Sequence, residues 1–237
     1  MAAVTDIARE QTRARYPDEE GYVQRDGVRV FWERYGDADT TFLLFPTSPI
    51  SHSRLWKAQI PYLARRYRVL TFDPRGNGRS DRPTEAAAYG YREMVEDGRA
   101  VLEAGGAERA ILTGLCDGGG LALMLASAHP ETALGVFALA PCVPYIGKPH
   151  PNYLRYPFAD ALDTDEGWAK WNIHYWRRDF RGFLEFFFSQ QLPEPHSTKQ
   201  IDDCVDWGLQ TDPETLTLAD EEAPVPWTSA EEGQAVC

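Results

Sequence analysis

The sequence predicts an α/β fold in which helices flank a mostly parallel, twisted sheet, with the sheet incomplete at its C-terminal end and followed by a helical cap. Three observations lead to this prediction. Short apolar runs alternate with amphipathic stretches across residues 41–140, the motif Gly-Leu-Cys-Asp-Gly at residues 114–118 stands between a strand-like and a helix-like segment, and aromatic residues crowd the region after Pro141. Strands that alternate with helices form right-handed crossover units around a parallel sheet.

The core is expected over residues 16–142, after a flexible N-terminal arm of residues 1–15. It begins with a hairpin, because strand-like runs flank Asp26-Gly27, a dipeptide that favours a tight turn. The hydrophobic pattern then predicts strands over residues 42–45, 67–72, 110–115 and 133–140 and helices over residues 55–66, 91–104 and 121–129. Strand and helix therefore alternate through the rest of the core.

Residues 143–237 are predicted to form an aromatic-rich, acidic helical cap that leads toward a missing C-terminal part of the core. They hold 17 of the 36 acidic residues and only 7 of the 24 basic ones. This uneven charge fits either a solvated acidic face or a surface that repels anionic substrates. The aromatic residues, Trp171 and Trp176 among them, either pack the small cap or line a substrate pocket, where these two are the candidate contacts.

The composition of the chain excludes some classes of binding partner. A chain of 237 residues with 43% hydrophobic content can bury one substantial core, and no apolar run has the length of a membrane span. The formal net charge of -12 argues against nucleic acid and anionic membranes as partners. The N-terminus lacks the features of a signal peptide, so a cytoplasmic location is expected.

The four cysteines, Cys116, Cys142, Cys204 and Cys237, are scattered without Cys-x-x-Cys spacing. This pattern indicates free thiols and suggests neither a disulfide framework nor a zinc site. No motif for a metal or an organic cofactor is found, and none is expected.

Cys116 is the candidate nucleophile. A strained strand-to-helix turn needs small residues on both sides, because side chains at Gly114 and Gly118 would collide with neighbouring backbone. The start of a helix stabilises a thiolate, whereas the carboxylate of Asp117 raises the pKa of a nearby thiol by repulsion. Asp117 itself either satisfies free N–H groups at the helix start, contacts substrate or handles a proton. The alternative for Cys116 is a small buried cysteine in a glycine-rich turn.

A second motif, Asp-Pro-Arg-Gly-Asn-Gly-Arg-Ser-Asp at residues 73–81, comes directly after a predicted buried strand. With this loop and the cysteine turn, residues 21–141 resemble the α/β-hydrolase superfamily, in which a D-x-R-G-x-G-x-S-D loop follows the fourth strand. The resemblance implies the α/β-hydrolase fold and a structural role for the loop. Cysteine at the nucleophile position is similar to dienelactone hydrolases, which implies activity on an ester, thioester or lactone.

The resemblance also implies an oxyanion hole formed by two backbone N–H groups, one from the residue after the nucleophile and one from the loop after the third strand. Here Phe45-Pro46 replaces the His-Gly of that loop, and Pro46 has no N–H to donate. Thr47, with Ser48 as the fallback and a further substrate contact, is therefore the candidate donor beside Asp117.

The acid and the histidine of a catalytic triad are not visible in this chain. Family members carry them after later strands, whereas residues 230–237 look like a helix leading into the next strand. His52 is a candidate substrate or oxyanion contact, and His129 is expected to end a helix. An incomplete sheet should expose an apolar edge, which a partner or self-association would cover.

Three functions remain open. The first is a hydrolase of a small apolar or acyl substrate that uses Cys116. The second is a non-catalytic module that binds or senses a small molecule on a degenerate hydrolase fold, and the third is an inactive fragment of a longer enzyme.

Overall fold

The computed structural model describes residues 15–143 and 151–221. Their sheet has six strands in the order β1-β2-β4-β3-β5-β6. The strands are β1 (Glu19–Arg25), β2 (Val28–Tyr35), β3 (Thr41–Leu44), β4 (Arg68–Phe72), β5 (Ala110–Leu115) and β6 (Ala133–Leu139). β2 is antiparallel to β1 and β4, and the remaining pairs are parallel. The predicted mostly parallel sheet is confirmed.

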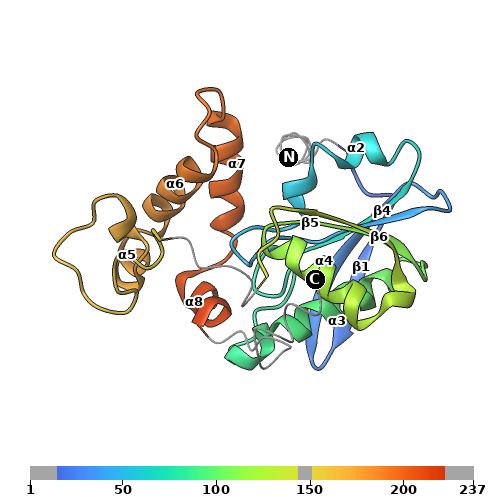
Figure 1. Cartoon of the computed structure of the whole chain (residues 1–237), viewed down its shortest axis with the longest axis horizontal. Coiled ribbons are helices and arrows are strands. Elements are labelled where there is room, and N and C mark those ends of the chain that lie inside the picture. The colour runs from blue at the N-terminus through green and yellow to red at the C-terminus, as the bar shows by residue number, and fades with distance from the viewer. Residues whose placement is uncertain (1–14, 144–150, 222–237) are drawn as a thin grey trace, which may run out of the picture.

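Helices cover both faces of this sheet (Figure 1). α2 (Ile60–Leu63) lies on one face, and α3 (Tyr91–Ala104) and α4 (Asp117–Ala128) lie on the other. Successive residues of a strand point to opposite faces. Leu43 accordingly belongs to the core beneath α3 and α4, and Leu44 belongs to the smaller core beneath α2.

Two predicted helices have different bounds in the structure. Residues 55–66 form no continuous helix but a 3-10 turn, η1 (Ser53–Trp56), followed by the short α2. Pro61 stands in the first turn of α2, and a proline without an N–H fits a helix only there, so α2 cannot extend back through it. α4 begins at Asp117, four residues earlier than predicted, because the glycines at 118–120 belong to the helix.

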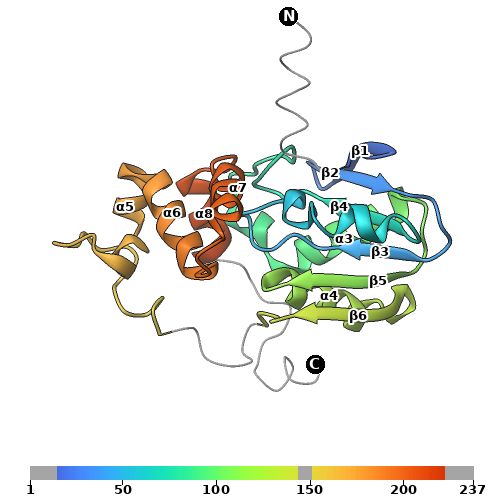
Figure 2. The same cartoon turned by 90° about the horizontal axis from the view of Figure 1, so that it is seen from above.

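Four further helices lie beyond the carboxyl ends of the parallel strands (Figure 2). They are α5 (Ile173–Arg178), α6 (Phe180–Gln191), α7 (Thr198–Gly208) and α8 (Pro213–Glu221), and are called the helical unit below. The remaining 3-10 turns are η2 (Ala86–Tyr89), η3 (Pro130–Thr132) and η4 (Gly167–Lys170). The helical unit has its own buried cluster, centred on Trp176, Phe183 and Leu184. Its role as a cap, and the predicted domain bounds, stay predictions, since residues 144–150 and 222–237 and most of the arm lie outside the described ranges.

The helical unit is attached to the loops that come after β3 and β4. Thr211 Oγ1 donates a buried hydrogen bond to the Gly76 carbonyl at 2.7 Å. Lys57 forms an ion pair with Asp203 on α7, and its Nζ lies 5.4 Å from the Trp207 ring centroid. These contacts position the helices over one end of the sheet.

The loop at residues 73–81 is held by buried polar contacts. Asp73 accepts hydrogen bonds from Ser53 Oγ at 2.6 Å and from the Arg79 amide at 2.9 Å. Arg75 forms a bidentate ion pair with Asp97 on α3, with both N···O distances at 2.7 Å. The expected structural role of this motif is therefore visible in its contacts.

β6 lies at one edge of the sheet and exposes apolar side chains. Among the described strands it pairs with β5 alone. Leu134 and Phe137 are 48% and 55% exposed, and Val136 and Leu139 are exposed as well. Such an edge favours association, although a covering partner or second copy stays a prediction. Within the described ranges, no helix is long and apolar enough to cross a membrane.

Candidate active site

Cys116 occupies the turn between β5 and α4. Its backbone has φ 55° and ψ -124°, a strained conformation that costs of order 1–3 kcal/mol in a residue other than glycine. The amides of Gly119 and Gly120 hold the turn by donating to the Cys116 carbonyl at 2.9 and 3.1 Å. The residue is exposed, and it directly follows β5, whose carboxyl end faces the helical unit (Figure 2).

The glycines around Cys116 are required by close backbone contacts. A Cβ at Gly114 would lie 2.0 Å from the Gly118 carbonyl oxygen, and a Cβ at Gly118 would lie 2.3 Å from that of Pro46. Neither contact is possible for a real side chain. The collisions predicted from the Gly-x-Cys-x-Gly spacing are thus present, and the second contact places the loop after β3 against the turn.

Cys142 lies beside Cys116, a proximity that the sequence did not predict. β5 and β6 are parallel neighbours, with Leu115 paired with Leu139, so the segments after them leave the sheet side by side. The Cys142 amide donates to the Cys116 carbonyl at 3.0 Å. The two sulfurs and a carboxylate oxygen of Asp117 all lie within 4.8 Å of one another. The available signal was that both cysteines come soon after strands predicted to be parallel.

These three groups influence one another's charge. The pKa of Cys116 lies below its ordinary value, chiefly because the Cys142 side chain hydrogen-bonds to its sulfur. Burial and the charge of Asp117 act in the opposite direction, and the Asp117 amide adds to the lowering. The pKa of Cys142 is raised by its hydrogen bond to Cys116, and burial raises the pKa of Asp117. Cys116 is therefore the more acidic thiol of the pair, and the expected repulsion by Asp117 is outweighed by Cys142.

The candidate oxyanion donors lie in two segments near the Cys116 turn. The Asp117 amide hydrogen-bonds to the Cys116 sulfur. In the described ranges the amides of Thr47 and Ser48 donate to no backbone carbonyl, and both residues are half-buried. The Thr47 hydroxyl lies 2.8 Å from that of Ser51, which fixes the loop. These placements are compatible with an oxyanion hole, and the roles of Thr47, Ser48 and Asp117 stay predictions.

His52 is buried against the loops, and its polar neighbours are Arg54 and Asp73 rather than Cys116. It is 4% exposed, its Nδ1 lies 3.5 Å from both the Arg54 amide and Asp73 Oδ1, and its Nε2 has no hydrogen-bond partner among the described residues. Its ring centroid is 6.0 Å from that of Trp207. A role in contacting substrate stays a prediction.

No hydrogen bond joins Cys116 to any histidine in the described part of the chain. His129 ends α4, as predicted, and its Nε2 pairs with Glu96 at 2.6 Å. His174 Nε2 contacts the Ala159 carbonyl at 3.0 Å, and His150 lies outside the described residues. The described residues therefore place no imidazole base beside the Cys116 thiol.

Trp171 and Trp176 belong to the aromatic packing of the helical unit. Trp176 is 1% exposed, with its ring centroid 4.5 Å from that of Phe183. Trp171 is half-buried and packs on Trp176 at 5.3 Å and on Tyr153 at 4.7 Å. Packing accounts for both residues, and a direct substrate contact by Trp176 would require this cluster to open.

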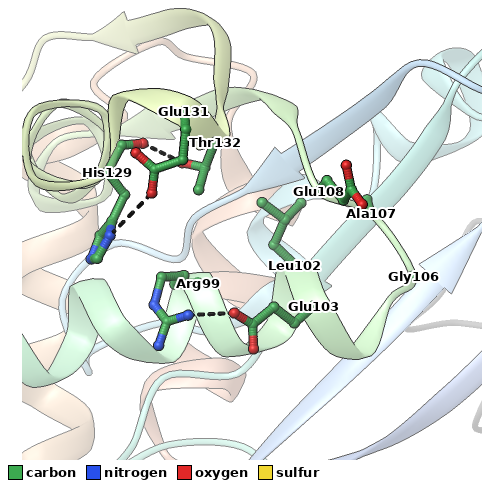
Figure 3. Close-up of a pocket in the computed structure, with 9 residues that line it drawn as sticks. All are labelled: Arg99, Leu102, Glu103, Gly106, Ala107, Glu108, His129, Glu131 and Thr132. Atoms are coloured by element: carbon green, nitrogen blue, oxygen red, sulfur yellow. Dashed lines mark hydrogen bonds and ion pairs between the residues drawn. The ribbon is translucent and has the colours of Figure 1, made fainter.

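A cavity of about 510 Å³ lies at the opposite end of the sheet, near the amino ends of β5 and β6 (Figure 3). Its lining residues are Arg99, Leu102, Glu103, Gly106, Ala107, Glu108, His129, Glu131 and Thr132. Two pairs form within this lining, Arg99 with Glu103 and His129 with Glu131. This cavity is separate from Cys116, and its lining includes no cysteine or serine.

The family model of the alpha/beta hydrolase fold matches residues 40–207, which include the Cys116 turn and the loop at 73–81. The chain belongs to the alpha/beta hydrolase fold family. This assignment covers both the parallel part of the sheet and most of the helical unit.

Individual relatives extend the comparison. An epoxide hydrolase B of Mycobacterium tuberculosis is 36% identical over 111 residues, which are 46% of this chain and 31% of that protein. The match therefore spans less than a third of that relative's length. An esterase from Exiguobacterium antarcticum has a TM-score of 0.69 at 19% identity, covering 90% of this chain and 75% of the other. An enol-lactonase from Burkholderia xenovorans LB400 has a TM-score of 0.62 at 18% identity, covering 86% and 74%. These two structures are similar in fold.

Proposed function

We propose that this chain is a hydrolase that opens an ester, thioester or lactone through Cys116. One observation carries the proposal: an exposed cysteine with φ 55° stands in the strained turn between β5 and α4. Strain of this kind persists only where surrounding contacts maintain it, and it clusters at functional sites. The names of similar proteins, an esterase and an enol-lactonase among them, agree with this class of substrate.

The chemistry would proceed in two steps. The Cys116 sulfur attacks the carbonyl carbon, a carbon–sulfur bond forms, and the carbonyl oxygen becomes an oxyanion that accepts hydrogen bonds from the Asp117 and Thr47 amides, with Ser48 as the fallback donor. Collapse expels the alcohol, thiol or ring oxygen, which takes up a proton. Water then cleaves the thioester on Cys116 and restores the thiol.

A thiolate favours acyl substrates over the epoxides named for some relatives. Opening an epoxide with sulfur leaves a thioether, and water does not cleave a thioether. An acyl group on sulfur is a thioester, which water does cleave. Cys116 can therefore turn over on an acyl substrate but would be consumed by an epoxide.

The second step has no histidine beside it in the described residues. General-base catalysis contributes about 10²–10⁴-fold to rates of this kind, so we expect acylation to be faster than deacylation. The expected kinetic signature is a burst of product equal to the amount of chain, followed by slow turnover.

Reaction with p-nitrophenyl acetate tests the proposal. We expect a stoichiometric burst of p-nitrophenol and one acetyl group on the peptide that holds Cys116, seen by mass spectrometry. Cys116→Ala should lose both, and Cys204→Ala, which changes a buried thiol on α7, should keep both. Equal bursts from the intact chain and Cys116→Ala would remove Cys116 as the nucleophile.

The second candidate is a module that binds a small apolar molecule without turning it over. This candidate is favoured because no described histidine forms a hydrogen bond with Cys116. A chain that protects Cys116 from alkylation when an ester is present, yet forms no acyl adduct, would support this alternative.

A further inference from the structure

We propose that Cys116, Cys142 and Asp117 together bind one thiophilic divalent cation of the Zn²⁺ class. The three side chains come from the β5–α4 turn, the first residue of α4 and the segment after β6. Their two sulfurs and one carboxylate oxygen all lie within 4.8 Å of one another. Cysteine spacing along the sequence gives no indication of this group, because 25 residues separate the two thiols and the sheet brings them together.

The backbone holds the two thiols in place. The Cys116 amide donates to Leu139 at 3.0 Å, and the Cys142 amide donates to Cys116 at 3.0 Å. A Cβ at Gly120 would lie 2.1 Å from the Cys142 carbonyl oxygen, so the segment that holds Cys142 packs directly on α4. The relative position of the two backbone segments that carry the sulfurs is therefore set by these contacts.

The donor set selects the kind of cation. Thiolates are soft ligands that favour Zn²⁺ or Cd²⁺ over Mg²⁺ and Ca²⁺. Ligand atoms on a tetrahedral Zn²⁺ lie roughly 3.5–3.8 Å apart, given bond lengths of about 2.3 Å to sulfur and 2.0 Å to oxygen. The three donor atoms, which lie within 4.8 Å of one another, therefore have to move closer together when the ion binds.

Exposure and charge support the same conclusion. Both cysteines are exposed and Asp117 is half-buried, so an ion can enter and a water can fill the fourth position. Metal ions bind the deprotonated form of cysteine, so binding of a dication releases the thiol protons. Because the ion would engage the Cys116 sulfur, its binding and acylation would exclude each other.

Cadmium binding to the full chain tests the site without reference to turnover. Cys204→Ala/Cys237→Ser provides a background in which Cys116 and Cys142 are the remaining thiols. After full reduction and removal of reductant without oxygen, we expect one Cd²⁺ per chain, an ultraviolet sulfur-to-cadmium charge-transfer band, and displacement of Cd²⁺ by Zn²⁺ but not by Mg²⁺.

Variants in that background test the contribution of each proposed metal ligand. Cys142→Ser and Asp117→Asn should each weaken Zn²⁺ binding by at least about tenfold, the lower bound of the effect seen when even an outer contact of a metal site is removed. Glu131→Gln, an exposed carboxylate on η3, should leave binding unchanged. Circular dichroism checks that each variant is folded, and native mass spectrometry of the unsubstituted chain repeats the stoichiometry.

Two results would overturn the proposal. One is a charge-transfer band that keeps its intensity in Cys142→Ser. The other is a fully reduced chain that forms a Cys116–Cys142 disulfide with a mild oxidant but does not bind Cd²⁺. Failure of the ester reaction alone would affect the proposed hydrolase and leave this binding result intact.

Discussion

The Cys142 amide donates a hydrogen bond to the carbonyl oxygen of Cys116 at 3.0 Å, so the backbone itself keeps a second thiol beside the candidate nucleophile. The Cys142 thiol in turn lowers the pKa of Cys116. The reactivity of Cys116 thus depends on the segments that follow both β5 and β6, and not on the β5–α4 turn alone.

Removing the Cys142 thiol should make Cys116 less acidic. The ordinary pKa of a cysteine here is 9.0, and that of Cys116 lies below it. In Cys142→Ala the hydrogen bond to the thiolate is lost, so the midpoint of Cys116 alkylation by iodoacetamide should move to higher pH. Peptide mapping by mass spectrometry measures the rate at Cys116 alone in both proteins.

The opposite shift is expected for Asp117→Asn. The charge of Asp117 raises the pKa of Cys116, so its removal should move the alkylation midpoint to lower pH while the Asp117 amide stays in place. If both variants shift the midpoint in the same direction, the assignment of these two effects is wrong.

A methyl group at Gly114 should disrupt the turn. Its Cβ would lie 2.0 Å from the Gly118 carbonyl oxygen, and overpacking of this kind costs about 1–3 kcal/mol or more. Gly114→Ala should therefore lower the free energy of unfolding by at least about 2 kcal/mol, measured by urea denaturation. Gly135→Ala is the matched control on β6, because its Cβ meets nothing within 4 Å; equal effects in the two would contradict the prediction.

Asp73→Asn should destabilise the core. Although burial acts to raise the pKa of Asp73, hydrogen bonds from His52 and other donors hold it well below 3.8. Leaving these buried donors without a charged acceptor costs about 2–4 kcal/mol. Asp81→Asn, in the same loop, breaks a more exposed pair with Arg29 and should cost less than about 1 kcal/mol.

The pH dependence of the Asp73 contribution has a defined sign. Because its pKa is lower in the folded state, its stabilisation is complete above 3.8 and is lost as the pH falls toward the folded-state value. The difference in free energy of unfolding between the intact chain and Asp73→Asn should therefore shrink in acid. A difference that is constant from pH 7 down to the acid transition would disprove the linkage.

A charge on β6 should reduce self-association. Phe137 is 55% exposed on an edge strand, and natural proteins protect such edges with lysine. Phe137→Lys should lower the association seen by sedimentation as concentration rises, whereas Tyr62→Lys, an exposed apolar residue on α2, should not. Unchanged sedimentation of Phe137→Lys would mean that this edge does not drive association.

The elements with a strong and clearly bounded pattern were predicted well. α3 and β5 have the predicted bounds, since glycines stand on both sides of α3 and β5 is a largely apolar run. The helix predicted at residues 55–66 was wrong because apolar spacing carried more weight than Pro61. The turn at Cys116 could be predicted from local glycine spacing, which acts over a few residues.

The rest of the site depended on contacts between distant segments. Cys142 reaches Cys116 only because β6 pairs with β5, and His52 is buried partly because Trp207 lies near it. Neither relationship leaves a periodic signal in one sequence. Pairing the predicted parallel strands and comparing the residues just beyond their carboxyl ends would have found the first.

Gly120 packs so closely on the Cys142 carbonyl that an added Cβ would lie 2.1 Å from its oxygen. A residue without a side chain therefore determines how closely the segment that holds Cys142 approaches the helix that follows Cys116. A change of one methyl group at this position would alter the chemistry of Cys116 and Cys142 while leaving both in place. Among relatives, the residue at this helix position would therefore be as informative about a paired thiol site as the cysteines themselves.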